Sequence, residues 1–116
     1  MPAALPTPSA LGRRLRAARL AKEWTQAQLG QRLLGLDEDD PGTAAPRISR
    51  YERGMHTPDL DTIERLAKLL DLPAAYFVAS SDTVAEAILV ISQLPPRKQK
   101  EALALLKELQ GSDKSR

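Results

Sequence analysis

Apolar residues recur at helical spacing along most of this sequence. Leu11, Leu15 and Ala18 stand at positions i, i+4 and i+7 and define one apolar face. No run of β-branched or aromatic residues alternates with a period of two, as a half-buried strand would require. The pattern therefore predicts an all-α protein, and a length of 116 residues suits one domain with a short appendage.

Local signals place the ends of the first two helices. The first helix is expected to run from about Ser9 to Glu23. Thr25 and Gln28 have the Thr-x-x-Gln spacing of a capping box, in which each side chain accepts a hydrogen bond from the other residue's backbone N–H. This box opens a second helix at residue 26. Gly35 can end that helix, because glycine readily adopts the left-handed conformation.

Similar signals bound the third and fourth helices. The third helix is expected between Thr43 and Gly54. With Thr43 as its cap, Pro46 occupies the first turn, where its missing N–H removes no helical hydrogen bond. Asp59 is expected to cap the fourth helix, whose buried side is formed by Leu60, Ile63, Leu66, Ala67 and Leu70.

Three more helices are expected at residues 73–78, 83–93 and 96–110. Residues 1–8 are predicted to be a flexible lead-in and residues 111–116 a flexible tail. We expect residues 9–80 to form one domain and residues 81–110 to form a helical hairpin.

Positive charge is clustered along the chain. The net charge is only +2, from 17 basic and 15 acidic residues, which does not by itself indicate nucleic-acid binding. Residues 13–23 nevertheless carry five basic side chains and one acidic one, and three arginines surround Glu52. The four residues Asp37, Glu38, Asp39 and Asp40 are all acidic. This distribution indicates one surface that faces a polyanion, with an acidic segment set apart from it.

The sequence gives no support for catalysis or metal binding. It contains no cysteine, one histidine and no phosphate-loop, HExxH or GxSxG motif. The acidic segment 37–40 lacks the alternating oxygen ligands and the distal glutamate of an EF-hand. We expect no enzyme activity, no cofactor and no metal.

No apolar run reaches the roughly 18 residues of a membrane span, and the absence of cysteine fits a cytoplasmic location.

Four features between Leu11 and Phe77 occur in a characteristic order. Thr25-Gln26 opens the second helix, Gly30 permits a close helix crossing, the run ISRYERG closes the third helix at Gly54, and Thr57-Pro58 precedes the fourth. In this order they resemble the helix-turn-helix of the Cro/lambda-repressor-like (XRE) transcription regulators. The resemblance implies a lambda-repressor-like five-helix DNA-binding domain over residues 9–80.

The resemblance also implies roles for individual residues. The third helix would enter the major groove, with Arg47 and Arg50 as readers, because a guanidinium matches the O6 and N7 acceptors of guanine. The groove-facing set is Ala45, Pro46, Arg47, Ser49 and Arg50. The expected phosphate contacts are Gln26, with Arg14, Arg53, Met55, His56 and Thr57 as further candidates. Arg19 and Glu52 match the family's internal ion pair. Arg47 and Arg50 could instead be solvated charges, and Gln26 could serve only the helix start.

The segment 84–94 is apolar in nearly every direction around a helix, so one small domain cannot cover it. Pairing with Leu103, Leu106 and Leu109 in a hairpin would give a homodimer contact. A two-fold dimer also suits a two-fold operator. The expected dimer interface is Val84, Ile88, Ile91, Leu103 and Leu106.

These features predict a dimeric regulator, a repressor, that binds a specific double-stranded DNA operator and no membrane. One alternative is a DNA-binding antitoxin, whose C-terminal helices would hold a toxin. Another is a helical protein-interaction adaptor without DNA binding, which the near-neutral net charge and the acidic segment favour. The linker from Leu33 to Ile48 is longer than the family's usual turn, and its four acids are expected to weaken binding to random DNA by repelling phosphates.

Overall fold

The computed structural model describes residues 9–35 and 42–114. These residues form seven α-helices and no strand. The helices are α1 (Ala10–Ala21), α2 (Gln26–Leu34), α3 (Ala44–Glu52), α4 (Leu60–Leu69), α5 (Ala74–Val78), α6 (Asp82–Gln93) and α7 (Pro96–Lys114). The predicted all-α class is therefore confirmed. The lead-in 1–8, the acidic segment 37–40 and the last two residues lie outside the described part.

Side-chain caps explain where several helices begin. Gln28 N donates to Thr25 Oγ1 at 3.0 Å and Thr25 N donates to Gln28 Oε1 at 2.8 Å, which confirms the predicted capping box. Thr62 N donates to Asp59 Oδ1 at 2.8 Å, as expected at the start of α4. Thr43 occupies the cap position of α3, but its side chain makes no capping hydrogen bond.

Glycines end two of the helices. Gly35 has φ of 69° and caps the end of α2, and Gly54 has φ of 75° just after α3. A left-handed backbone is far less strained at glycine than at a residue with a Cβ. Both predicted helix ends are therefore confirmed.

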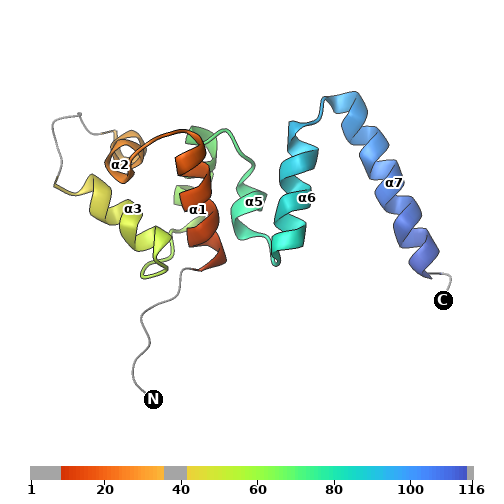
Figure 1. Cartoon of the computed structure of the whole chain (residues 1–116), viewed down its shortest axis with the longest axis horizontal. Helices are drawn as coiled ribbons and strands as arrows, with labels where there is room; N and C mark the ends of the chain where they lie inside the picture. The colour runs from red at the N-terminus through yellow and green to blue at the C-terminus, as the bar shows by residue number, and fades with distance from the viewer. Residues whose placement is uncertain (1–8, 36–41, 115–116) are drawn as a thin grey trace, which may run out of the picture.

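The core lies among α1–α5, which Figure 1 shows grouped on one side of the molecule. Leu15 from α1, Leu29 and Leu33 from α2, Ile48 from α3 and Phe77 from α5 are the largest fully buried side chains. Trp24 and Tyr76 are partly buried against this cluster. Burial of these side chains supplies the main driving force for folding this unit.

Two glycines allow the helices of this unit to approach closely. A Cβ built at Gly30 would lie 2.7 Å from the carbonyl carbon of Ala44, at the start of α3. A Cβ at Gly12 would lie 2.5 Å from the carbonyl oxygen of Glu52. The predicted role of Gly30 at a helix crossing is confirmed, and Gly12 brings α1 equally close to α3.

The C-terminal helices lie outside this core. α6 packs along α5 and buries only Ala85, and α7 diverges from α6 after a short turn (Figure 1). Gln99 Nε2 donates to the carbonyl oxygen of Ile91 at 3.0 Å near that turn. Leu103 and Leu109 are 52% and 68% exposed, so they do not pack against α6 within one chain.

The end of α7 corrects one prediction. Residues 111–114 were expected to belong to a loose tail, but the helix continues through Gly111 to Lys114. One glycine costs a helix only about 1 kcal/mol relative to alanine, so the strong helix formers before it can carry the helix onward. Within the described residues, no helix is long and apolar enough to cross a membrane.

Candidate nucleic-acid interface

α2 and α3 pack against each other in a helix-turn-helix arrangement, with α3 at the edge of the domain (Figure 1). Ala44, Ile48 and Tyr51 turn into the core and fix the rotation of α3 about its axis. The residues between them therefore point outward. Of the predicted groove-facing set, Pro46, Arg47 and Arg50 are exposed, and Ala45 and Ser49 are partly buried.

The two predicted base readers differ in their surroundings. Arg47 Nε donates to the hydroxyl of Tyr51 at 3.1 Å, one helical turn farther on. This bond orients the Arg47 guanidinium and leaves its two terminal NH₂ groups available as donors. Arg50 is exposed, and its side chain has no hydrogen-bond partner among the described residues.

Arg19 and Glu52 form a buried ion pair beneath this surface. Arg19 Nε donates to Glu52 Oε2 at 2.7 Å and Arg19 Nη2 donates to Glu52 Oε1 at 3.0 Å, a two-pronged contact between α1 and α3. Arg19 Nη1 also donates to the carbonyl oxygen of Trp24 at 2.8 Å. These contacts satisfy both charged groups, which burial requires.

Gln26 lies at the first position of α2, beside this pair. Its Nε2 donates to Glu52 Oε1 at 3.1 Å. The same NH₂ group has a second hydrogen that can face solvent. Gln26 therefore has one attachment inside the domain and one donor left for a ligand.

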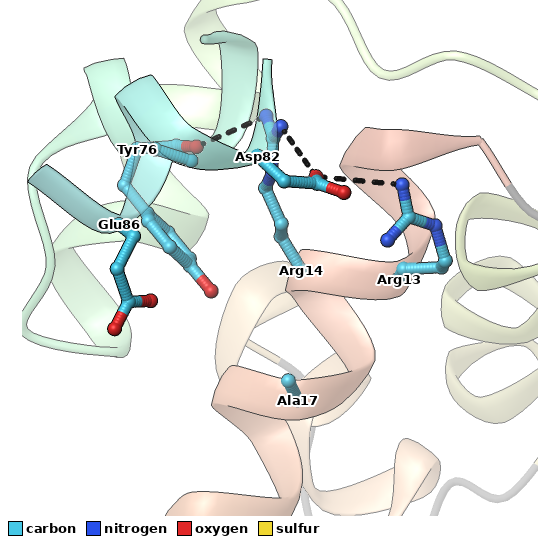
Figure 2. Close-up of a pocket in the computed structure, with 7 residues that line it drawn as sticks. Arg13, Arg14, Ala17, Tyr76, Asp82 and Glu86 are labelled. Atoms are coloured by element: carbon cyan, nitrogen blue, oxygen red, sulfur yellow. Dashed lines mark hydrogen bonds and ion pairs between the residues drawn. The ribbon is translucent and has the colours of Figure 1, made fainter. Parts of the chain in front are cut away.

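Arg14 corrects another prediction. It was expected to contact phosphate, but it is 5% exposed and its Nη1 donates to the carbonyl oxygens of Tyr76 (3.3 Å), Phe77 (3.3 Å) and Ala79 (2.9 Å). Its Nη2 donates to Asp82 Oδ1 at 3.1 Å, as Figure 2 shows. Arg14 thus closes the end of α5 and is not exposed to a DNA backbone.

Asp82 accepts from a second arginine as well. Arg13 Nη2 lies 3.5 Å from Asp82 Oδ1, on the other side of the carboxylate from Arg14 (Figure 2). The hydrogen bond from Arg14, together with the positive charge of Arg13, lowers the pKa of the Asp82 carboxyl below its ordinary value. The first residue of α6 is thereby held to α1.

The remaining predicted phosphate contacts follow α3. Arg53, Met55, His56 and Thr57 are exposed. Met55 N donates to the carbonyl oxygen of Arg50 at 2.9 Å, which folds this turn back onto the end of α3. The turn therefore stays close to the exposed arginines of the helix.

Two arginines of α1 border this region, and the sequence predicted for them only a shared place on a surface that faces a polyanion. Arg13 and Arg16 line a pocket of about 380 Å³ together with Gln26, Ser49, Glu52 and Arg53. The sequence placed Arg13 and Arg16 within a basic stretch, but nothing local shows which of its residues face α2 and α3. Among the described residues no cluster of His, Asp and Glu could hold a metal ion.

A family model described as a helix-turn-helix domain matches residues 10–76. The chain belongs to this helix-turn-helix domain family. The match runs from the start of α1 into α5, and it therefore covers the whole arrangement just described. This agrees with the resemblance seen in the motifs of α2 and α3.

A solved structure extends the likeness of the helix-turn-helix domain to the C-terminal helices. The crystal structure of the transcriptional regulator BswR is 40% identical in sequence, with a TM-score of 0.75. The similarity covers 87% of this chain and 96% of that chain, and so reaches beyond residues 10–76. A comparison with curated proteins gave no match.

Proposed function

We propose that this chain is a DNA-binding transcription regulator that inserts α3 into the major groove. The observation that carries the proposal is the rotation of α3, in which buried Ile48 and Tyr51 leave Arg47 and Arg50 facing outward. Membership of the helix-turn-helix family and the similarity to a transcriptional regulator support it. Bound across a promoter, such a protein excludes polymerase, and we propose repression as its action.

The proposed contacts fall into two groups. Arg50 and Arg47 read guanine, while Ala45, Pro46 and Ser49 offer small contacts such as that to a thymine methyl. Gln26 and the residues after α3, namely Arg53, Met55, His56 and Thr57, bind backbone phosphates. Phosphate contacts fix the position on the duplex, and base contacts supply specificity.

We further propose that the protein acts as a homodimer through α6 and α7. Val84, Leu103 and Leu106 are each about half exposed, and a second copy would remove them from water. Ile88 and Ile91 are partly buried and complete the proposed interface. A two-fold dimer would present two α3 helices to half-sites about one turn of DNA apart.

The DNA proposal is tested by first selecting an operator from random duplexes and then comparing variants on it. Arg50→Ala should weaken binding to the selected operator by about 1–3 kcal/mol and relax the preference at one base pair. Arg97→Ala, at an exposed position of α7, is the control for loss of one positive charge. Equal weakening on selected and random DNA would contradict base reading by Arg50.

The dimer proposal is tested on the full chain by sedimentation. Leu103→Glu combined with Leu106→Glu should give a monomer, because two carboxylates cannot be buried in an apolar interface. Leu60→Glu is the control and should leave the dimer intact, because Leu60 is 64% exposed at the start of α4 and not buried as its helical spacing predicts. An unchanged dimer in the double variant would place the interface elsewhere.

A second candidate function follows from the same exposed leucines of α7. They could hold a protein partner, as in a DNA-binding antitoxin that binds its toxin. Such a chain would bind DNA with a steep salt dependence, whereas an adaptor without DNA binding would show none. A salt titration with random duplex therefore separates the regulator and the antitoxin from the adaptor, and co-purification with a gene neighbour's product separates the first two.

A further inference from the structure

We infer that Arg16 and Arg53, together with Gln26, hold one phosphate of the DNA backbone beside α3. This inference rests on the proposed function and adds α1 to the elements that contact DNA. The three residues come from three elements: α1, the end of α3 and the start of α2. They meet in the pocket of about 380 Å³ that also contains Arg13, Ser49 and Glu52.

The charge of this pocket is positive. Glu52 contributes a carboxylate at its base, but Arg19 already neutralises it through two hydrogen bonds. Arg13, Arg16 and Arg53 therefore leave a local excess of positive charge. Such an excess at a concave surface attracts anions.

Free hydrogen-bond donors are also present. Arg16 is exposed, and its side chain has no hydrogen-bond or ion-pair partner among the described residues. Arg53 Nε makes one long bond of 3.4 Å to the carbonyl oxygen of Ser49, which leaves its terminal NH₂ groups as donors. Gln26 has one amide hydrogen beyond the bond to Glu52.

The position of the pocket selects a DNA phosphate as its ligand. Ser49 lines the pocket and also belongs to the groove-facing set of α3. An anion held here lies next to the groove that α3 enters, where the backbone of the duplex must pass. A phosphodiester offers two unesterified oxygens, which planar guanidinium groups bind in two-pronged fashion.

Arg13 lines the same pocket but makes a different contact. Its guanidinium reaches Asp82 at 3.5 Å, and Figure 2 shows it directed toward that carboxylate. The phosphate contact is therefore assigned to Arg16 and Arg53.

The test measures the binding of full-length protein to a random-sequence duplex across a range of salt concentrations. Each phosphate neutralised adds about −0.9 to the slope of log K against log salt. Arg16→Ala/Arg53→Ala should make the slope less negative by about 0.9 for each subunit bound, and so by about 1.8 for the proposed dimer, because the two arginines of one subunit share one phosphate. Arg16→Lys/Arg53→Lys keeps both charges and should retain most of the slope.

Arg97→Ala/Lys100→Ala is the matched control, since it removes two positive charges from exposed positions of α7. It should leave the slope unchanged. The inference is overturned if the Arg16/Arg53 variant keeps the full slope or if the control loses as much. A loss of about 1.8 for each subunit bound, about 3.6 for the dimer, would mean two separate phosphates and would also overturn it. If the unaltered protein shows no salt-dependent binding, the proposed function itself fails, a result distinct from the others.

Discussion

The guanidinium of Arg14 and the carboxylate of Asp82 lie 3.1 Å apart, and this contact joins α1 to the first residue of α6. The same guanidinium also donates hydrogen bonds to three carbonyl oxygens at the end of α5. One buried side chain thus connects the helix-turn-helix domain to the helices that follow it. In a dimer formed through α6 and α7, this contact would set the orientation of each α3.

Loss of Arg14 should destabilise the fold. Arg14→Met keeps much of the side-chain volume but leaves the carbonyl oxygens of Tyr76, Phe77 and Ala79 without this donor. Because buried acceptors are then left unsatisfied, the unfolding free energy of this variant should fall by about 1–3 kcal/mol. Urea denaturation measures the change. Arg16→Met, on the same helix but exposed, should change the unfolding free energy by less than about 0.5 kcal/mol. Equal effects of the two variants would contradict a structural role for Arg14.

The Arg19–Glu52 pair should show strong coupling. Glu52→Gln leaves the Arg19 charge buried without its counter-charge, which should reduce the unfolding free energy by about 3–5 kcal/mol. Arg19→Met/Glu52→Leu removes both charges and should recover a large part of that loss. A double-mutant cycle of Arg19→Met, Glu52→Leu and the variant that combines them measures the interaction from denaturation curves. Additive single effects would show that the pair is not coupled.

Two glycines should respond in opposite ways to the same substitution. Gly30→Ala should lower the unfolding free energy by about 1–3 kcal/mol, because the new methyl group would collide with the Ala44 backbone. Gly111 has no atom within 4 Å of an added Cβ and lies within α7. Gly111→Ala should stabilise α7 locally by up to about 1 kcal/mol. Circular dichroism should show this as a higher helix content. A stable Gly30→Ala protein would refute the close crossing of α2 and α3.

The loss of fold stability at low pH should depend on Asp59 and Asp82, the aspartates at the starts of α4 and α6. The hydrogen bonds from Thr62 lower the pKa of Asp59 below its ordinary 3.8, and those from Arg14 lower that of Asp82. A group with a lowered pKa stabilises the fold above its unfolded-state pKa, and this contribution disappears as pH falls through the folded-state value. Stability should therefore decline below about pH 3.8. Asp59→Asn/Asp82→Asn should show a shallower decline in thermal melts between about pH 4 and pH 2; an identical decline would mean that other carboxyls control it.

Local patterns predicted the helix ends well, because caps act over three or four residues. The Thr25–Gln28 box, Asp59, Gly35 and Gly54 each fix a boundary without help from the rest of the chain. α5 and α6 begin within one residue of their expected positions. The prediction was wrong at Gly111, where the helix was expected to end. The small loss of helix stability that a glycine causes is outweighed there by the helix formers that precede it.

Contacts between distant residues were harder to predict. Arg14 bonds to residues 62 to 68 positions away, and no local feature separates it from the exposed Arg13 and Arg16. Arg19 and Glu52 could be paired only through the family resemblance, since their spacing of 33 residues carries no signal of its own. The pocket between α1, α2 and α3 depends on helix packing and could not be seen in the sequence.

The buried core is divided unevenly along the chain. Among the residues that the structure describes, every buried side chain but Ala85 precedes α6, and those of α7 contribute none. The C-terminal helices can therefore be exchanged during evolution without rebuilding the interior of the first five. Chains that share this domain could then diverge in how they assemble, and so in the spacing of the sites they occupy, while the face of α3 stays the same.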